Sequence, residues 1–361
     1  MRGIIRAAAV AAAAVAVLAI VSPAAARTRV VTPGHSIQHA INQSHPGDTI
    51  LVEDGRYRES LDIGTDRLTI RGEDADDVIL VPPSSPSSLC DTGGGPPGQI
   101  TGICVHGQVA STGGPPQVTR NVQKVRIAGL TVRGFSGDGV FIFGGQKTLL
   151  KRMHLDRNGG YGAFSNTSRG TRYIDNLVTH NSAPGLYIGD SPHANSVVRD
   201  NVSVGNHGEG LLLRSATGGR VSDNVFEHNC AGILVLADAP GPAGSWILER
   251  NSADENNRAC AGEADQGEPP ISGIGIGVLG ASHTRVRDNT VVGNRALHQS
   301  IAHGGIVIGR GDPNGTAPAH DSVKDNTLAS NSPFDIDWDG SGSVTFRRND
   351  CDRSRPGGIC H

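Results

Sequence analysis

The 361-residue sequence predicts an all-β fold, a parallel β-helix in which about ten short coils stack into a solenoid. Three observations predict it. Pairs of asparagines five residues apart recur along the chain, each pair precedes a glycine and a short aliphatic strand, and the 50 glycines follow no Gly-X-Y period. A hydrophobic content of 37% also argues against a disordered chain. The pairs are Asn176/Asn181, Asn201/Asn206, Asn224/Asn229, Asn251/Asn256, Asn289/Asn294 and Asn326/Asn331.

The N-terminus carries an export signal before any of these repeats. Two arginines precede an apolar run over residues 7–21, and small residues follow it up to Ala26. This pattern is typical of a secretory signal peptide over residues 1–26, so we expect a secreted, extracellular or periplasmic mature chain, 27–361. An uncleaved anchor is the alternative, and the sequence disfavours it because the apolar run is short for a bilayer span. No later segment has the length and apolarity of a membrane span.

The charge balance excludes a nucleic-acid-binding protein. After loss of the signal peptide, the chain carries 30 basic and 35 acidic residues. Proteins that bind nucleic acid need an excess of basic residues to neutralise its phosphates. We therefore expect no nucleic-acid partner.

A short amphipathic helix is expected before the first coil, in a cap over residues 33–45. Ile37, Ala40 and Ile41 fall on one helical face. The open end of a stack of parallel strands exposes unpaired backbone groups, so a helix laid across it protects that edge. The strand-like runs of the first coils begin in residues 46–63.

The coils themselves are expected over residues 46–351, within a single domain that spans 27–361. Asparagine tolerates the left-handed backbone of tight turns, and its amide can hydrogen-bond to the same asparagine of the next coil. No copy can bury its own apolar face, so the copies must stack on one another. The second strand of the copies reads GVFIF (139–143), GAFSN (162–166), GLYIG (185–189), GLLLR (210–214), GILVL (232–236) and GIVIG (305–309).

These second strands also predict a stripe of side chains on the outside of the solenoid. The first and third residues after glycine are small or aliphatic, so they point inward by the period of two. The residue between them is then outward, and an apolar stripe there is unusual on an exposed surface. The outward residues are Phe141, Phe164, Tyr187, Leu212 and Leu234.

The stripe and the next outward row supply candidate substrate-binding residues. Phe141, Phe164 and Tyr187 could stack on sugar rings, with Asn166 and Asp190 beside them. In the same row Arg214 could hold a carboxylate through two hydrogen bonds. Alternatively, the Pro/Gly/Ser-rich segment 82–120, interpreted as one long loop, covers the stripe.

Six cysteines in an exported chain predict three disulfides. A metal cluster is the alternative, but no Cys-x-x-Cys spacing occurs. The last pair would pin the C-terminal end, residues 344–361. Sequence proximity favours the pairs Cys90–Cys104, Cys230–Cys260 and Cys351–Cys360.

Two long loops are expected to form a wall beside the stripe. Residues 257–272 and 295–304 both extend the turn between the second asparagine and the glycine, in consecutive coils. Because corresponding turns of adjacent coils lie side by side, these loops should rise together. Cys260 in the first loop could then reach Cys230, one coil earlier.

A band of imidazoles and carboxylates runs along the same edge and supplies the candidate catalytic residues. Neighbouring coils lie about 4.8 Å apart, so we expect His228 and Glu255 to be near contact, with His180 two coils before His228. His207 falls in the coil between these histidines, and His303 lies in the second wall loop. A carboxylate beside an imidazole suits general acid–base chemistry. The alternatives are a solvated turn and metal binding by the same histidines.

The segment SIQHAINQSHPGDTILVEDGRYRES (36–60) resembles the N-terminal signature of the right-handed β-helix, pectate-lyase-like superfamily. Together with the Asn/Gly repeats, the resemblance covers roughly residues 33–351, and it is most similar to β-helix proteins with carbohydrate-binding and sugar-hydrolase repeats. It implies a right-handed β-helix and a polysaccharide partner. It leaves the reaction open, because this fold hosts lyases, hydrolases, epimerases, esterases, transferases and binding proteins.

Relatives of pectate lyase usually hold calcium with clustered aspartates and abstract a proton with arginine or lysine. Arg214 matches that residue type, and Asp190 is its candidate companion. No carboxylate cluster surrounds Arg214 in the sequence, and the paired aspartates that hydrolases of this fold need on adjacent coils cannot be placed.

A second feature resembles a calcium loop. Asp335, Asp337 and Asp339 alternate as such a loop begins, but the twelfth position is Phe346 rather than glutamate. The repeat register makes the three aspartates outward residues of one strand, and neighbours in such a row lie about 7 Å apart. Calcium is therefore only a candidate ion, and the sequence assigns no metal ligand and no certain cofactor.

The leading hypothesis is a secreted carbohydrate-active enzyme, a polysaccharide lyase or epimerase acting on an acidic, uronate-containing glycan. Arg214 would neutralise the uronate or attack near it, while His228 with Glu255, or His207, moves the proton. The alternatives are a non-catalytic extracellular glycan-binding or accessory scaffold and a β-helix glycoside hydrolase.

Overall fold

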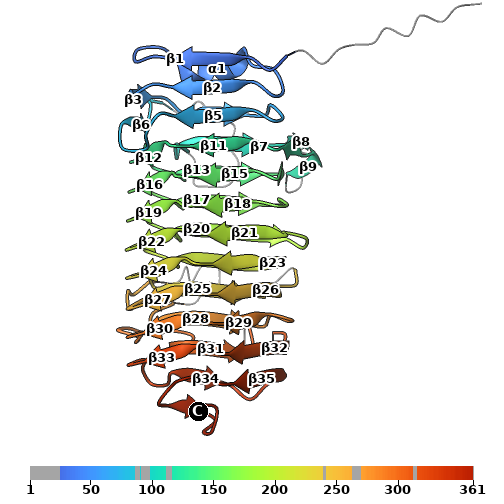
Figure 1. Ribbon diagram of the computed structural model, residues 1–361, viewed down its shortest axis with the longest axis vertical. Coiled ribbons are helices and arrows are strands. Elements are labelled where there is room, and N and C mark those ends of the chain that lie inside the picture. The colour runs from blue at the N-terminus through green and yellow to red at the C-terminus, as the bar shows by residue number, and fades with distance from the viewer. Residues whose placement is uncertain are drawn as a thin grey trace, which may run out of the picture.

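The computed structural model describes residues 25–85, 90, 98–110, 116–238, 241–261, 270–311 and 315–360. The expected signal peptide over residues 1–26 lies outside the described residues, apart from its last two. The chain winds into an elongated stack of coils along one axis (Figure 1). The predicted parallel β-helix is confirmed, because successive coils pair in parallel, strand on strand.

Each coil contributes up to three strands, which stack into three parallel sheets named here A, B and C. β23 turns a corner, so that its first half pairs in sheet C and its second half in sheet A. Sheet A contains β1 (Thr28–Val31), β2 (Thr49–Val52), β5 (Thr69–Gly72), β11 (Arg126–Ala128), β15 (Leu149–Lys151), β18 (Arg172–Ile174), β21 (Ser196–Arg199), β23 (Leu211–Ser222), β26 (Gly244–Glu249), β29 (Arg285–Arg287), β32 (Ala319–Lys324) and β35 (Ser343–Arg347).

Sheets B and C complete the coils, and two small pairs lie beside them. Sheet B contains β3 (Gly55–Arg58), β6 (Val78–Val81), β12 (Thr131–Arg133), β16 (His154–Asp156), β19 (Leu177–Thr179), β22 (Val202–Val204), β24 (Val225–Glu227), β27 (Ser252–Asp254), β30 (Thr290–Val292) and β33 (Thr327–Ala329). Sheet C contains β4 (Leu61–Ile63), β7 (Ile103–His106), β13 (Val140–Phe143), β17 (Ala163–Asn166), β20 (Leu186–Ser191), β23, β25 (Ala231–Leu236), β28 (Ile274–Leu279), β31 (Gly304–Gly309), β34 (Ile336–Trp338) and β36 (Ser354–Arg355). The small pairs are β8 (Gln108–Ala110) with β9 (Gln117–Arg120), and β10 (Val122–Gln123) with β14 (Gly145–Gln146).

The expected capping helix is confirmed as α1 (Ile37–Asn42), which lies at the N-terminal end of the stack (Figure 1). Its buried side chains are the three expected on one face. Ser36 caps it by accepting a hydrogen bond from the His39 backbone N–H. The Glu59 carboxylate accepts from the backbone N–H groups of Ile37 and Gln38, at 2.7 and 3.1 Å, so the first turn is satisfied from the coil below it.

The repeated asparagines form two buried ladders inside the corners of the coils. Asn201 illustrates the pattern: its Nδ2 donates to Oδ1 of Asn224 at 2.8 Å and to the backbone oxygen of Tyr173 at 2.9 Å. One ladder runs from Asn176 to Asn349 between sheets A and B, and the other from Asn158 to Asn331 between sheets B and C. Each amide is thus satisfied by the coils on either side, which is why the residue recurs at fixed spacing.

The glycine after each second asparagine recurs because the ladder occupies the space of a side chain. A Cβ on Gly210 would lie 2.9 Å from Nδ2 of Asn229 and 2.6 Å from the Phe226 ring. A Cβ on Gly232 would lie 3.0 Å from Nδ2 of Asn256. The glycines that begin the strands of sheet C are therefore packing requirements of the ladder.

The interpretation of residues 82–120 as one long loop is wrong for its second half. β7 lies within that segment and pairs with β4 and β13 in sheet C. Ile103 and Val105 are fully buried in the core, as at the inward positions of other coils. The segment Gly102–Val105 has the strand pattern, but no asparagine pair precedes it, so the repeat did not identify it.

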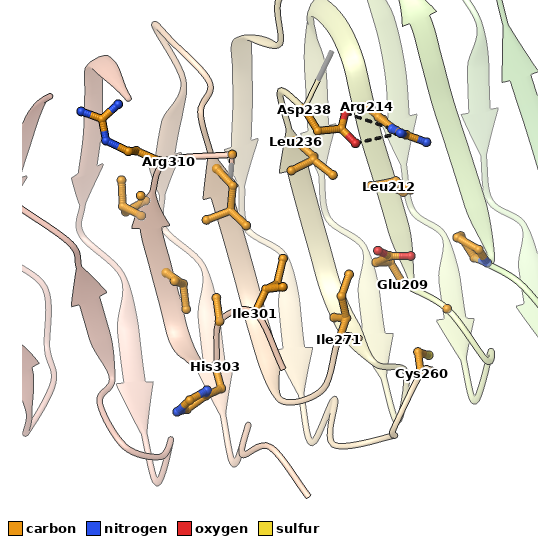
Figure 2. Close-up of a pocket in the computed structure, with 18 of the residues that line it drawn as sticks. Glu209, Leu212, Arg214, Leu236, Asp238, Cys260, Ile271, Ile301, His303 and Arg310 are labelled. Carbon is orange, nitrogen blue, oxygen red and sulfur yellow. Dashed lines mark hydrogen bonds and ion pairs between the residues drawn. The ribbon is translucent and has the colours of Figure 1, made fainter. Parts of the chain in front are cut away.

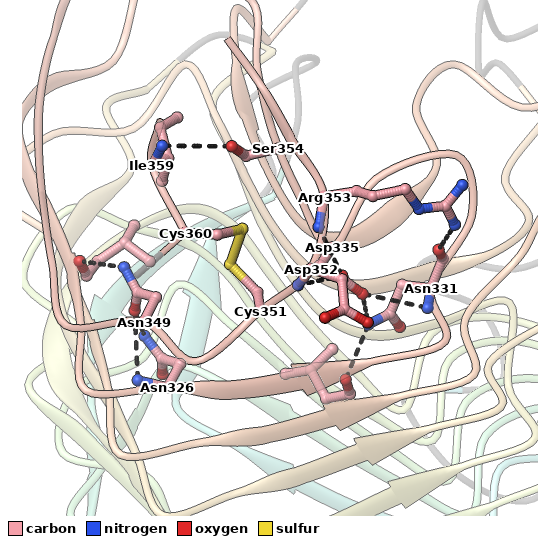
Figure 3. Close-up of a disulfide and its surroundings, with 12 residues drawn as sticks. Asn326, Asn331, Asp335, Asn349, Cys351, Asp352, Arg353, Ser354, Ile359 and Cys360 are labelled. Carbon is pink, nitrogen blue, oxygen red and sulfur yellow. Dashed lines mark hydrogen bonds between the residues drawn. A yellow bond between two sulfur atoms is a disulfide. The ribbon is translucent and has the colours of Figure 1, made fainter. Parts of the chain in front are cut away.

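All three expected cysteine pairs are disulfide-bonded, and the structure describes all six cysteines. The Cα–Cα distances are 5.7 Å for Cys90–Cys104, 5.8 Å for Cys230–Cys260 and 5.1 Å for Cys351–Cys360. The last of these closes the C-terminal end beside the final asparagine of a ladder (Figure 3). In the described residues, no helix is long and apolar enough to span a membrane.

Candidate functional site

A groove of about 990 Å³ lies on the outer face of sheet C, in the C-terminal half of the solenoid. Outward side chains of β23, β25, β28 and β31 contribute its apolar floor: Leu212, Leu236, Leu279 and Val307. Figure 2 shows Arg214, Asp238 and Arg310 along one side, and Glu209, Cys260 and His303 toward the other. The two sides are called here the arginine rim and the histidine rim, the latter also including His207.

The histidine rim is raised by the two long loops, as expected. The backbone N–H of Ile301 donates a hydrogen bond to the backbone oxygen of Pro270 at 3.1 Å. The backbone N–H of Ser272 donates to Ser300 Oγ at 2.9 Å. The loops that contain residues 257–272 and 295–304 therefore contact one another where they are described. The Cys230–Cys260 disulfide ties the first loop to the preceding coil.

The outer stripe exists in the expected register, but most of it is buried. Phe141, Phe164, Tyr187, Leu212 and Leu234 occupy equivalent positions in adjacent strands. Tyr187, Leu212 and Leu234 are 4%, 8% and 0% exposed, and Ile271 and Ala302 from the two wall loops pack against this cluster. The wall loops therefore cover part of the stripe. The cover expected from residues 82–120 stays a prediction, because much of that segment lies outside the described residues.

The aromatic side chains form one stacked group at the N-terminal end of the groove. The Phe141 and Phe164 rings lie 5.1 Å apart, and the Phe164 and Tyr187 rings 4.4 Å apart. Tyr161, which lines the groove, stacks on Phe164 at 4.6 Å. The Tyr187 ring lies over Gly189, and a Cβ on that glycine would lie only 2.0 Å from the Tyr187 hydroxyl oxygen. Tyr161, Phe141 and Phe164 are only half-buried and keep part of their faces accessible.

Arg214 pairs with a carboxylate of the next coil. Its Nε donates to Oδ1 of Asp238 at 3.0 Å, and its Nη2 lies 2.8 Å from Oδ2. Asp190, the expected companion, instead accepts a hydrogen bond from Asn166 Nδ2 at 2.9 Å. The companion expected from the sequence is corrected to Asp238, because β25 places residue 236 opposite Arg214 and the chain then turns back toward it.

The C-terminal end of the groove has a second pair of this kind, which the sequence did not reveal. Arg355 donates from Nε and Nη2 to the two oxygens of Asp337, at 2.6 and 2.7 Å. Its guanidinium also lies 5.3 Å from the centre of the Phe334 ring. Arg355 follows the last recognisable repeat, and only the register of β36 on β34 brings it opposite Asp337.

His207 on the histidine rim is neutral at neutral pH. Burial lowers the pKa of His207, and the positive charges of Arg258 and His180 lower it further. Two residues on, Glu209 lines the groove and is only 6% exposed. His303 also lines the groove, and its buried Nδ1 has no hydrogen-bond partner among the described residues. A neutral imidazole can accept a proton from a bound molecule.

The structure places His228 and Glu255 close together but not in the groove. Nδ1 of His228 lies 3.7 Å from Oε2 of Glu255, and the two side chains are 56% and 64% exposed. His180 lies 3.6 Å from Asp156 in the same corner. His180, His228 and Glu255 adopt the left-handed backbone of the turn before the second asparagine, with φ between 48° and 55°. Among described residues that line the groove, only Arg214, His207 and His303 belong to the expected set.

The three C-terminal aspartates have separate protein partners. Asp335 is 1% exposed and accepts from Asn331, so the expectation of an outward side chain is wrong there. Asp337 pairs with Arg355, and Asp339 accepts from the Arg310 backbone N–H at 3.0 Å. Asp335 occupies the position that glycine fills in other coils, and its carboxylate turns toward the ladder. Among the described residues, no three His, Cys, Asp or Glu side chains group as metal ligands.

Two further carboxyls titrate near neutral pH. Burial raises the pKa of Asp138 to about 7, and it accepts from the Tyr161 backbone N–H at 2.9 Å, beside the aromatic group. Burial also raises the pKa of Asp321 to about 7, inside the stack. Neither residue lines the groove as described.

Comparison with known proteins identifies the fold. Residues 118–350 match the family model described as right handed beta helix region, which confirms the predicted handedness. No curated protein matches the chain in sequence. The A-module of the mannuronan C-5 epimerase AlgE4 of Azotobacter vinelandii superposes with a TM-score of 0.57 at 16% identity, over 86% of this chain and 88% of that one.

A second solved structure is similar over the same extent. An alginate lyase from Paenibacillus sp. str. FPU-7 superposes with a TM-score of 0.52 at 13% identity, over 88% of this chain and 97% of that one. Sequence identities this low establish the shared fold alone.

Proposed function

This chain belongs to the right-handed β-helix family, and from that premise we propose that its groove binds an acidic, uronate-containing polysaccharide and acts on it as a lyase or epimerase. The observation that carries the proposal is the pairing of two chemically different rims across an apolar floor. The arginine rim offers Arg214 to a carboxylate, and the histidine rim offers His207 as a base. Glu209 and Arg214 are five positions apart, so their Cα atoms lie at most about 16 Å from one another, with room for a sugar chain between the rims.

The reaction requires removal of a proton from the carbon next to the uronate carboxylate. Arg214 neutralises that carboxylate and so stabilises the developing carbanion. His207 accepts the proton. In elimination, the electron pair forms a C4–C5 double bond as the C4–O bond to the leaving sugar breaks, and the leaving oxygen takes up a proton. In epimerisation, a proton returns to C5 from the opposite face.

Three further features support this proposal. The half-buried rings of Tyr161, Phe141 and Phe164 continue the groove toward the N-terminus and offer apolar faces to sugar rings. The lining side chains come from many successive coils, so a polymer rather than a small molecule fits the groove. Proteins of the same fold include a mannuronan C-5 epimerase module and an alginate lyase. This similarity supports the proposal of a lyase or epimerase but does not assign the activity.

We propose further that the chain is exported, cleaved near Ala26 and active outside the cell as a single β-helix domain over residues 27–361. Three disulfides fit an oxidising compartment. A polysaccharide is too large to cross a membrane, so an enzyme acting on one outside the cell has to be exported.

The test is incubation of the mature chain with a panel of acidic polysaccharides. A lyase produces ultraviolet absorbance from the new double bond, and an epimerase changes the uronate signals in the proton NMR spectrum. His207→Ala and Arg214→Gln should each abolish the change. His228→Ala is the matched control, since that histidine lies outside the groove. If no uronate polymer is altered under any condition, the enzymatic proposal is refuted.

A non-catalytic glycan-binding scaffold is the second candidate, and one observation favours it. Arg214 and Arg355 are each engaged by an aspartate of a neighbouring coil, so the groove's cations are partly neutralised before any glycan arrives. A scaffold would bind the polymer, as seen by affinity electrophoresis, and His207→Ala would leave that binding unchanged while no product forms.

A further inference from the structure

Six successive strands of sheet A, from β5 to β23, each carry one outward cation. Every one of these side chains flanks a buried inward residue of its strand, as Arg126 flanks Ile127 and Arg172 flanks Tyr173. All are exposed except Lys151, which is half-buried. The series is Arg71 in β5, Arg126 in β11, Lys151 in β15, Arg172 in β18, Arg199 in β21 and Arg220 in β23.

These cations alternate between two columns of the sheet. In one column Arg126 is followed by Leu149 and then by Arg172, and in the other Lys151 is followed by Ile174 and then by Arg199. A cation in one column thus stands beside an uncharged residue of the next coil. The charges form a zigzag along the solenoid axis that advances about 4.8 Å per cation.

The corner before these strands adds further positive charge. Hydrogen bonds from Arg67 N–H to the Gln123 oxygen and from Lys124 N–H to the Gln146 oxygen stack Arg67, Lys124 and Lys147 in one column. All three side chains are exposed. The corner and the first four strands of the zigzag form the surface named here the basic face: Arg67, Arg71, Lys124, Arg126, Lys147, Lys151, Arg169 and Arg172.

No carboxylate stands in the two columns of β5, β11, β15 and β18 that carry the cations of the basic face. Within the described part of the chain, none of its eight cations has an ion-pair partner. Asp66 at its edge is paired with Arg120. At the corner that follows sheet A, Glu73 and Asp74 come after β5 and Asp175 after β18. Further along the zigzag, Arg199 pairs with Asp200 and Arg220 with Glu249, so the uncompensated charge ends at β18. The whole chain nevertheless has a net charge of −3.

Such an arrangement costs stability unless a ligand compensates it. Like charges on neighbouring strands repel. The chain does pair such cations elsewhere in sheet A, where Glu249 forms ion pairs with Arg220 and Arg287. A row of exposed cations attracts a polyanion through many weak contacts and raises its local concentration. Five of the eight cations are arginine, whose guanidinium can bind a carboxylate through two hydrogen bonds.

We propose that the basic face docks a linear carboxylated polysaccharide, which lies along the solenoid axis with one carboxylate near each coil. An extended uronate chain presents its carboxylates to alternate sides at intervals comparable to the coil spacing, which matches the zigzag. Leu149 and Val197 are half-buried between the cations and offer apolar contact to sugar rings. A polyanion without rings gains nothing from those residues.

This proposal shares its polymer with the proposed function of the groove, but not its residues. The basic face lies on β5, β11, β15 and β18 of sheet A, whereas the groove lies on sheet C from β23 onward, with Tyr161 at its N-terminal end. A long polymer held on the basic face stays near the groove between reaction events, so its effective concentration rises. Docking can be present without turnover, and turnover without docking.

The test compares two triple charge reversals with the same change in net charge. One changes the basic face, Arg126→Glu/Lys151→Glu/Arg172→Glu, and the control changes exposed cations elsewhere, Arg56→Glu/Arg58→Glu/Arg347→Glu. Binding of polygalacturonate, polymannuronate and inorganic polyphosphate is measured by affinity electrophoresis and calorimetry at two salt concentrations. His207→Ala is included to prevent turnover. Circular dichroism confirms that each variant is folded.

We expect the face variant to lose at least about tenfold in affinity for the polyuronates, and the control variant to change less than about twofold. Equal losses in both triples would overturn the proposal, since net charge alone would then explain binding. Polyphosphate bound as tightly as the polyuronates would overturn the assignment to a carboxylated polysaccharide. If wild-type chain turns over polymer, the face variant should raise KM for the polymer but not for a trisaccharide. Absence of turnover, with docking retained, would refute only the function proposed for the groove.

Discussion

Asn331 donates from Nδ2 to Oδ1 of Asp335 at 3.0 Å, and this hydrogen bond ends the second asparagine ladder (Figure 3). In every earlier coil of that ladder, the acceptor is the asparagine of the following coil. Oδ2 of Asp335 accepts from the backbone N–H groups of Asp352 and Arg353, both at 3.1 Å. An ionised carboxylate only accepts hydrogen bonds, so it can close a ladder that has no further asparagine to supply an oxygen.

Asp335→Ala should therefore destabilise the protein strongly. The substitution leaves Asn331 Nδ2 and N–H and the N–H groups of Asp352 and Arg353 without their acceptor. Each buried donor left unsatisfied costs about 1–3 kcal/mol, and water can reach some of them at the end of the stack, so we expect a total of about 2–4 kcal/mol by urea unfolding. Asp335→Asn keeps one acceptor oxygen and should lose less. Equal stability of Asp335→Ala and the wild type would contradict this account.

Gly210→Ala should cost about 1–3 kcal/mol, the usual range for overpacking. Its Cβ would lie 2.6 Å from the Phe226 ring, 2.8 Å from the Gly232 oxygen and 2.9 Å from Asn229 Nδ2. Gly357→Ala is the matched control, because nothing lies within 4 Å of its Cβ and its backbone is not left-handed. Chemical unfolding should show a lower midpoint for the first variant alone. A similar loss in both would mean that backbone freedom, not ladder packing, explains the repeated glycine.

The activity should keep its full rate to mildly acidic pH. Because burial and nearby positive charge lower the pKa of His207 below 6.5, the neutral base persists below that pH, and kcat/KM should fall only as pH drops through the lowered value. Arg258→Gln removes one of the positive charges and should move this acid limb to higher pH. His207→Ala should lower kcat/KM by about 10²–10⁴-fold, against less than about twofold for His228→Ala. An acid limb that does not move in Arg258→Gln would argue for a different base.

Asp321→Asn should stabilise the protein at alkaline pH. Asp321 is 3% exposed, and burial raises its pKa from 3.8 to about 7, so the folded state holds a proton that the unfolded chain releases. The stability that this proton contributes is complete below pH 4 and is lost as pH rises toward about 7. The variant's advantage should therefore grow over that window to at most about 4 kcal/mol, at 1.36 kcal/mol per pKa unit. Unfolding midpoints at pH 4.5 and 8 measure it, and an advantage that is constant with pH would refute it.

Residues with a repeating environment were predictable from the sequence. Asn201 and Gly210 have the same neighbours in each coil, so their spacing alone indicated the ladder and the strand that follows it. The outward register of Phe164 and Tyr187 followed from the same period. Strand β7 was not predicted, because its coil lacks the asparagine pair, although its inward residues are buried like those of the other coils.

Residues of the candidate site were predictable only in part. The contact between His228 and Glu255 was expected from coil spacing and is found, yet both face solvent at a corner. Asp238 and Arg355 were missed as partners, since the chain reaches them through a turn and past the last repeat. The basic face was visible in the sequence as ordinary surface charge, and only the register of sheet A showed its zigzag.

By itself the sequence determined the solenoid: which residues stack, which point inward, and which cysteines lie close enough to pair. Those properties repeat from coil to coil, so local geometry and burial impose them at every turn. The tertiary structure alone decided which charges share the groove and which remain at an exposed corner. That outcome depends on loops of unequal length and on side chains from different coils, whose positions no repeat specifies.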